Sequence, residues 1–259
     1  MIPRALTIAT SDSGGGAGIQ ADLKAFAAAG CHGTSTLVAL TAQSTTAVTA
    51  VHELPGEFVI AQLEAVFGDI GVDAAKTGML ISRRLIGVVA DFLEQHPVPL
   101  VVDPVLLASS GAQLLQDDAV EILVARLFPL ARVVTPNLHE AEVLTDRPGA
   151  PRRELAARLV ELGAPAALVT GGHGDPAVDH LFDGSEHHEI PVPRHHVPAT
   201  HGAGCTHSAT LAARLAHGDA LPEAAAAAAS VASEAVRNGL VELGAGEGPV
   251  DVFGLRGAA

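Results

Sequence analysis

Hydrophobic residues in this chain form short apolar runs that alternate with longer segments in which apolar residues recur every three or four positions. Short runs are typical of buried strands, and the longer periodicity is typical of amphipathic helices. The runs predict strands at 5–9, 33–40, 72–76, 100–102, 132–134 and 166–170. The periodic segments predict helices at 19–29, 55–67, 83–95, 151–162 and 221–240. A further helix is predicted to begin at the loop 201–205 and to run to residue 217. This alternation predicts a mostly parallel sheet with helices on both faces.

The pattern changes after residue 177. Two β-rich runs, 178–182 and 187–192, are separated by Asp183-Gly184-Ser185-Glu186, which contains an Asp-Gly turn signal. Such a pair predicts an antiparallel hairpin appended to the parallel sheet.

The length of 259 residues and the 48% hydrophobic content suit one large domain, which we expect to span 1–259. The longest apolar runs are interrupted before they reach membrane-spanning length, and the first residues lead into a strand rather than a signal sequence. The two cysteines, Cys31 and Cys205, form no disulfide framework. We therefore expect a cytoplasmic protein without membrane contact.

A net charge of −14 argues against nucleic acid as a partner, because binding a duplex requires a basic surface. A small anion can still be bound locally. The only lysines are Lys24 and Lys76, and we give little functional weight to this scarcity of lysine. Tyrosine and tryptophan are absent, which leaves phenylalanine as the one aromatic platform for stacking.

The stretch His201-Gly202-Ala203-Gly204-Cys205-Thr206-His207-Ser208 opens a predicted helix. Backbone N–H groups at the start of a helix have no intrahelical partner, and the helix dipole adds positive potential, so Gly202, Ala203 and Gly204 predict an anion site. Cys205 falls in the first helical turn, where this field favours a thiolate with an acid–base or nucleophilic role. The alternative is a glycine turn that leads into a core helix with a small buried cysteine.

Two acidic residues follow predicted strands. Asp103 comes directly after the run at 100–102, and Glu140 lies a few residues after the run at 132–134. Each alone is compatible with a helix cap or a surface carboxylate. Together, at corresponding ends of one sheet, they could share a hard cation.

Thirteen histidines invite a search for a metal site. His187, His188, His195, His196, His201 and His207 occupy predicted hairpin and loop positions without the recurring spacing of zinc ligands. We expect solvated loop histidines instead.

The glycines of Ser13-Gly14-Gly15-Gly16-Ala17-Gly18 follow the first strand. Their spacing does not fit the dinucleotide fingerprint, and no acidic residue ends a second strand about twenty positions later, which disfavours a Rossmann site. Glycines here could equally let the backbone approach another ligand.

Taken together, these motifs resemble the hydroxymethylpyrimidine/phosphomethylpyrimidine kinases of thiamine biosynthesis, members of the ribokinase-like superfamily. The resemblance runs through the whole chain in order and rests on these stretches: 5–9, 11–24, Thr41-Ala42-Gln43, Lys76-Thr77-Gly78-Met79, Val102-Asp103-Pro104-Val105, Thr135-Pro136-Asn137-Leu138-His139-Glu140-Ala141, Gly171-Gly172-His173 and 200–206. Most sugar kinases of the superfamily carry aspartate where Cys205 stands.

The resemblance implies an α/β fold, a ribokinase-like three-layer α/β/α sandwich with a mostly parallel central sheet and a small antiparallel hairpin. It also implies transfer of the γ-phosphoryl group of ATP to 4-amino-5-hydroxymethyl-2-methylpyrimidine and then to its monophosphate, with Mg²⁺ as cofactor and a homodimer as the assembly. Phosphoryl transfer depends mainly on positioning and charge stabilisation, which agrees with an anion site of backbone donors.

Roles for single residues follow from the same resemblance. It places Cys205 with Gly202, Ala203 and Gly204 at the reacting group. It places Asp22, Gln43, Met79 and Val105 in the pyrimidine pocket, and a carboxamide such as that of Gln43 can pair with an aminopyrimidine edge. It places Asn137, Thr170 and Gly172 at the nucleotide, and Asp103 and Glu140 at the magnesium.

The chain departs from the family pattern at five positions. Thr10 replaces a glycine, Ser44 an asparagine, Ser109 and Thr170 each a lysine, and His207 an apolar residue. Loss of two lysines near phosphates would weaken nucleotide or monophosphate binding, and Thr10 adds bulk near the pyrimidine. Two alternatives therefore stay open: a pyridoxal or pyridoxine kinase of the same superfamily, and a non-catalytic nucleotide-binding regulatory protein. Retention of Cys205, Asp103 and Glu140 speaks against the latter.

Overall fold

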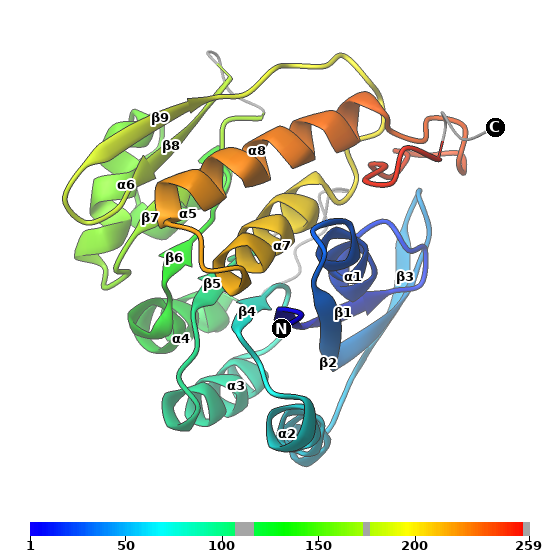
Figure 1. The fold of residues 1–259 in the computed structure, drawn as a ribbon, viewed down its shortest axis with the longest axis vertical. Coiled ribbons are helices and arrows are strands. Elements are labelled where there is room, and N and C mark those ends of the chain that lie inside the picture. Colours follow the sequence, from blue (N-terminus) through cyan, green and yellow to red (C-terminus); the bar gives the residue numbers. More distant parts are fainter. Residues whose placement is uncertain (107–116, 173–176, 256–259) are drawn as a thin grey trace.

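The computed structural model describes residues 1–106, 117–172 and 177–255, and these residues build a nine-stranded sheet (Figure 1). The strand order is β3-β2-β1-β4-β5-β6-β7-β8-β9. The strands are β1 (Arg4–Asp12), β2 (His32–Gln43), β3 (Val48–Glu53), β4 (Ala74–Thr77), β5 (Leu100–Val102), β6 (Val133–Val134), β7 (Ala167–Val169), β8 (Val178–Phe182) and β9 (His187–Pro191). Pairing is parallel from β2 to β7, and antiparallel between β2 and β3 and through β7, β8 and β9.

Helices cover both faces of the sheet and complete a three-layer α/β/α sandwich. One face carries α1 (Gly18–Ala28), α7 (Ala203–Ala216) and α8 (Leu221–Arg237). The other carries α2 (Gly56–Ala65), α3 (Arg83–Gln95), α4 (Asp117–Leu127), α5 (Leu138–Thr145) and α6 (Arg152–Glu161). The expected fold class is thus confirmed, and the described helices include none long and apolar enough to cross a membrane.

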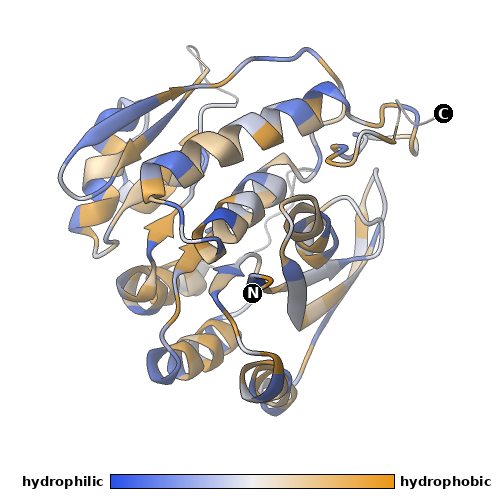
Figure 2. Ribbon diagram, in the orientation of Figure 1, coloured by the Kyte–Doolittle hydropathy of each residue, from blue (hydrophilic) through white to orange (hydrophobic). Residues whose placement is uncertain are grey.

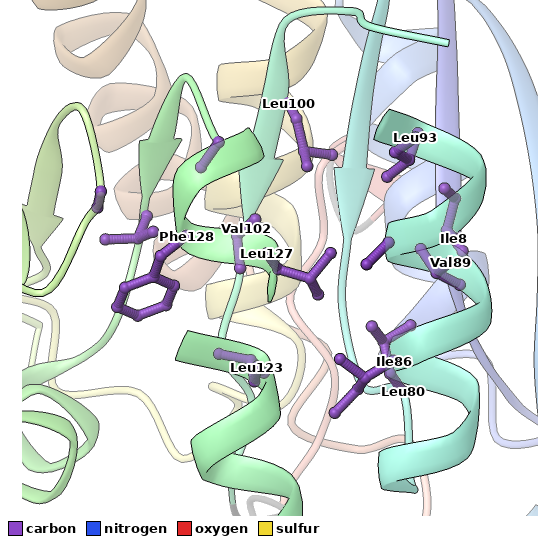
Figure 3. Packing of buried hydrophobic residues seen from close by; sticks show 14 of the residues in the cluster. Ile8, Leu80, Ile86, Val89, Leu93, Leu100, Val102, Leu123, Leu127 and Phe128 are labelled. Carbon is purple, nitrogen blue, oxygen red and sulfur yellow. The ribbon is translucent and has the colours of Figure 1, made fainter. Parts of the chain in front are cut away.

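The sheet is buried on both faces, which explains why its strands appear in the sequence as continuous apolar runs. In β5, Leu100 and Val102 pack against α3 and α4, while Val101 packs on the α7 side. Figure 3 shows the packing on the α3 and α4 side of the sheet, where side chains of these helices meet those of the strands. The hydropathy colours of Figure 2 accordingly mark β5 and β6 as hydrophobic.

The predicted elements agree with the structure where an apolar pattern is strong. α3 and β5 have the expected bounds, and the hairpin of β8 and β9 is present. The last helix ends at Arg237 rather than at residue 240, because the chain turns at Asn238 and Gly239. Three elements were missed: β3, whose side chains are mostly exposed, and the helices α4 and α5.

Candidate active site

The carboxyl ends of the parallel strands and the amino end of α7 surround one pocket of about 510 Å³. Ligands of open α/β sheets bind at this edge. Twelve of the residues singled out in the sequence line it: Gln43, Met79, Asp103, Val105, Asn137, Glu140, Thr170, Gly172, Gly202, Ala203, Gly204 and Cys205. We call the part around Thr10, Gln43 and Met79 the β1 end of the pocket, and the part around Asn137, Thr170 and Gly172 the β7 end.

The anion loop, residues 202–205, begins α7 between these two ends. Gly202 has a φ of 82°, and a Cβ atom there would stand 1.8 Å from the carbonyl oxygen of Gly16, so only glycine fits. An added Cβ at Gly204 would meet nothing within 4 Å. Ala203 differs from expectation, because its N–H donates to the carbonyl of Thr200 at 3.0 Å. The first-turn donors available to an anion are therefore those of Gly204 and Cys205.

The Cys205 thiol is not stabilised as a thiolate, contrary to the simplest expectation from its place at a helix start. Burial, together with the carboxylates of Asp22 and Asp103, raises the pKa of this thiol to about 12. The charge of Lys76 and a hydrogen bond from the N–H of Gly18 act in the opposite direction but do not prevail. In the protein without ligands Cys205 is a protonated thiol at neutral pH.

Lys76 lies at the floor of the pocket and is fully buried. Its ammonium is 2.8 Å from a carboxylate oxygen of Asp22 and 3.6 Å from one of Asp103. Burial alone would lower the pKa of Lys76, but the charges of Asp22, Cys205 and Asp103 raise it above its ordinary value. Lys76 therefore supplies the pocket with a permanent buried cation, a role that was not expected from the sequence.

Asp22 occupies a different place from the one expected. It is fully buried, does not line the pocket, and is bonded to Lys76 and to the Thr7 hydroxyl, which donates to it at 2.6 Å. A buried carboxylate requires such partners. In this structure Asp22 binds the ammonium of Lys76 and does not face the pocket.

Asp103 and Glu140 lie near each other although they come from different segments. Asp103 accepts a hydrogen bond from Ser208 of α7 at 2.7 Å. Glu140 forms a capping box at the start of α5: it accepts from the N–H of Asn137 at 2.9 Å, and Asn137 accepts from the N–H of Glu140 at 2.9 Å. Burial and the charge of Asp103 raise the pKa of Glu140 to about 8. Glu140 can therefore cap α5 and at the same time share an acidic site with Asp103.

The β1 end of the pocket is lined by Gln43, Met79 and Val105. The carboxamide oxygen of Gln43 accepts a hydrogen bond from Thr41 at 3.1 Å, and its nitrogen lies 3.5 Å from Nε2 of His201. The amide is therefore held in place at the pocket wall. Of the departures from the family pattern, Thr10 lines the pocket and its hydroxyl donates to the carbonyl of Met79 at 3.0 Å.

The β7 end of the pocket is held together by backbone pairing. Asn137 and Thr170 form an isolated parallel bridge, in which the N–H of Thr170 donates to Pro136 at 3.0 Å. The Asn137 side chain is engaged in the cap of α5, so its remaining hydrogen-bonding capacity is what a ligand can use. Ser44 does not line the pocket, and Ser109 and His173 lie outside the described residues.

The expectation of solvated histidines is wrong at two positions. His207 belongs to α7, is 5% exposed, and its Nε2 lies 3.1 Å from Asp179. His201 is largely covered, and its Nε2 lies 3.1 Å from Asp12. Both histidines line the pocket. In the sequence, Asp12 and His201 stand beside glycine-rich stretches, which is the one hint that these two residues belong to the site. No sequence signal marked Asp179.

Comparisons with known proteins show which kinases the chain resembles. A family model described as phosphomethylpyrimidine kinase matches residues 12–251. The hydroxymethylpyrimidine/phosphomethylpyrimidine kinase of Rhizobium meliloti is 48% identical over 256 residues, which cover 96% of each chain.

Two solved structures show how far the fold is shared. An ADP complex of Bacillus subtilis pyridoxal kinase has a TM-score of 0.90 at 35% identity and covers 99% of both chains. A phosphomethylpyrimidine kinase from Clostridium difficile has a TM-score of 0.81 at 38% identity, over 91% of this chain and 100% of its own.

Proposed function

The chain belongs to the phosphomethylpyrimidine kinase family, and we propose that it transfers the γ-phosphoryl group of ATP in thiamine biosynthesis. The acceptors are the hydroxymethyl oxygen of 4-amino-5-hydroxymethyl-2-methylpyrimidine and then the phosphate of the monophosphate. The observation that carries this proposal is the position of the anion loop between the two ends of one pocket. A phosphoryl donor at the β7 end and an acceptor at the β1 end would meet there, where backbone donors stabilise the transferring group.

Gln43, Met79 and Val105 would bind the pyrimidine at the β1 end of the pocket. The Gln43 carboxamide offers both a donor and an acceptor, the combination that an aminopyrimidine edge requires. Asp22, which lies beneath the pocket, would act by positioning Lys76 rather than by contact.

Asn137, Thr170 and Gly172 would contact the nucleotide at the β7 end. Within the described part of the chain, an added Cβ at Gly172 would meet nothing within 4 Å, so these residues leave the backbone open on that side. A flat ligand can therefore approach it closely.

Asp103 and Glu140 fit a magnesium site. The charge of Asp103 contributes to the raised pKa of Glu140, which indicates two carboxylates close enough to benefit from a cation between them. Among the described residues no group of three or more His, Cys, Asp or Glu could hold a metal alone. Magnesium usually takes one or two carboxylates and completes its shell with phosphate oxygens and water. Bound there, it would neutralise charge on the phosphates.

Cys205 would face the substrate hydroxyl at the amino end of α7. With a thiol pKa of about 12, it can act as the base only if the loaded site favours the thiolate more than the unloaded one, because the charge of Lys76 alone does not outweigh burial. Otherwise it serves as a small residue of the anion loop.

A pyridoxal kinase is the second candidate, and the close structural likeness to the Bacillus subtilis pyridoxal kinase favours it. The decisive experiment measures ADP formation by the purified protein with ATP, Mg²⁺ and each of three acceptors: the hydroxymethylpyrimidine, its monophosphate and pyridoxal. We expect both pyrimidines to be phosphorylated faster than pyridoxal. Faster turnover of pyridoxal would replace the proposal with the second candidate, and no turnover with any acceptor would favour a regulatory protein.

We also propose a cytoplasmic homodimer. Strand β3 is an edge strand, and Val51 on it and Leu40 on β2 are exposed apolar residues. Exposed strand edges need cover, and a second copy would supply it. A monomeric mass in light scattering at micromolar concentration would contradict this proposal.

A further inference from the structure

His207 is a buried side chain at the border of the pocket, and half of its hydrogen-bonding capacity is unused. Its ring is 5% exposed and lines the pocket. Nε2 lies 3.1 Å from one carboxylate oxygen of Asp179, and the other oxygen accepts the N–H of Gly171 at 2.6 Å. Nδ1 is buried and has no hydrogen-bond partner within the part of the chain that the structure describes.

Asp179 determines which ring nitrogen carries hydrogen. Because a carboxylate only accepts hydrogen bonds, Nε2 must donate to it. Nδ1 is then either a bare acceptor in the neutral ring or a second donor in the charged ring. Native structures rarely leave a buried polar atom unpaired, so an unpaired atom beside a ligand pocket points to a partner that arrives with the ligand.

His207 lies on the side of α7 that faces the β7 end of the pocket. Cys205, two residues earlier, belongs to the anion loop, and Asp179 and Gly171 belong to the segments after β7. Among the described residues, the other charged side chains that line the pocket are Asp12, Lys76, Asp103, Glu140, Arg194 and Glu247, besides Asp179 itself. Lys76 is already paired with Asp22 and Asp103. A group that spans from the anion loop to the β7 end would pass His207.

We propose that His207 binds a phosphate oxygen of the nucleotide through Nδ1, with the ring oriented by Asp179. This inference rests on the proposed function, because it takes the ligand at the β7 end to be a nucleoside di- or triphosphate. In this complex Nε2 donates to Asp179 and Nδ1 donates to a phosphate oxygen, so that both hydrogen bonds of the ring have a charged acceptor.

The test measures binding of ADP, pyrophosphate and adenosine by calorimetry to the wild type and to His207→Gln. The glutamine amide nitrogen can occupy the place of Nε2 and keep the Asp179 contact, but glutamine offers nothing at Nδ1. We expect an unchanged melting temperature and dissociation constants for ADP and pyrophosphate roughly tenfold higher or more, the effect of a lost charge-assisted hydrogen bond. Adenosine, which has no phosphate, should bind equally to both proteins.

His188→Gln is the matched control, because His188 also lies 3.1 Å from a carboxylate, that of Asp183, but does not line the pocket. It should bind all three ligands as the wild type does. His207→Asn reverses the design: its amide can reach the place of Nδ1 but not Asp179, so it should bind ADP more tightly than the glutamine variant.

The outcomes separate the two levels of the proposal. If the wild type binds neither ADP nor pyrophosphate, the proposed function itself fails. If the wild type binds ADP and His207→Gln binds it equally well, or if adenosine binding falls as much as ADP binding, His207 does not bind phosphate. Equal or weaker ADP binding by His207→Asn than by His207→Gln would also overturn the assignment to Nδ1.

Discussion

Lys76→Met should destabilise the protein far more than the loss of an ordinary ion pair. Lys76 and Asp22 are 2.8 Å apart and both side chains are 0% exposed, so the variant leaves the Asp22 carboxylate buried, with the Thr7 hydroxyl as its one remaining hydrogen-bond partner among the described residues. Breaking a buried pair from one side costs about 3–5 kcal/mol. At about 2–4 °C per kcal/mol for chains of this size, the melting temperature should fall by roughly 6–20 °C. Thermal unfolding followed by circular dichroism measures this directly.

Two further variants make the prediction specific. Arg4→Met removes one partner of the Arg4–Asp73 pair, which is 2.6 Å long but about one-third exposed on each side, and should lower the melting temperature much less. Lys76→Met combined with Asp22→Asn removes both members of this pair and should recover more than half of the lost stability without recovering activity, because Lys76 lines the pocket. If Lys76→Met costs no more than Arg4→Met, or if the double variant is no more stable than the single one, the buried pair does not have the role assigned to it.

Four further predictions concern the pocket. Gln43→Leu should raise the KM for the pyrimidine more than that for ATP, since an unpaired polar group costs about 1–3 kcal/mol; equal increases would contradict the assignment. Asp103→Asn should lower kcat and raise the magnesium concentration needed for half-maximal activity while the melting temperature stays roughly constant; an unchanged magnesium dependence would leave Asp103 with a structural role. Cys205→Asp should retain far more kcat at neutral pH than Cys205→Ser, with similar ATP binding, and a fully active serine variant would exclude a base at this position. Gly202→Ala should lower the melting temperature because its Cβ would overlap the backbone of Gly16, whereas Gly204→Ala should not; equal stability of the two would show that the loop adapts.

The sequence predicts the composition of the pocket better than its electrostatics. Asp103 follows an apolar run and Glu140 follows the next strand, and parallel strands bring their carboxyl ends to one edge, so their proximity could be expected. The sheet itself was predictable for the same reason, because strands buried on both faces are continuous apolar runs. β3 escaped prediction because an exposed edge strand has no such run.

The sequence could not show how deeply a side chain is buried or which way it points. Asp22 lies on α1, and only the packing of that helix on β1 decides that its carboxylate meets Thr7 and Lys76 rather than the pocket. The pKa of Cys205 depends on the competition between burial, which raises it, and the charge of Lys76, which lowers it, and burial prevails. His207 stands where the resemblance implies an apolar residue, but nothing in the sequence identifies Asp179 as its buried partner.

The two glycine loops of the site interlock although Asp12 and His201, which join them, are 189 positions apart in the sequence. Gly202 leaves no room for a side chain beside Gly16, an added Cβ at Gly16 would stand 2.2 Å from the His201 ring, and His201 reaches back to Asp12. A substitution in either loop is therefore tolerated only with the partner loop that accommodates it. In a chimera of two related kinases, a single crossover anywhere between these loops would take one loop from each parent. The site should keep its structure only where both parents carry the same residues at these contacts. Exchange of the segment between the loops, by contrast, leaves the inherited pair intact.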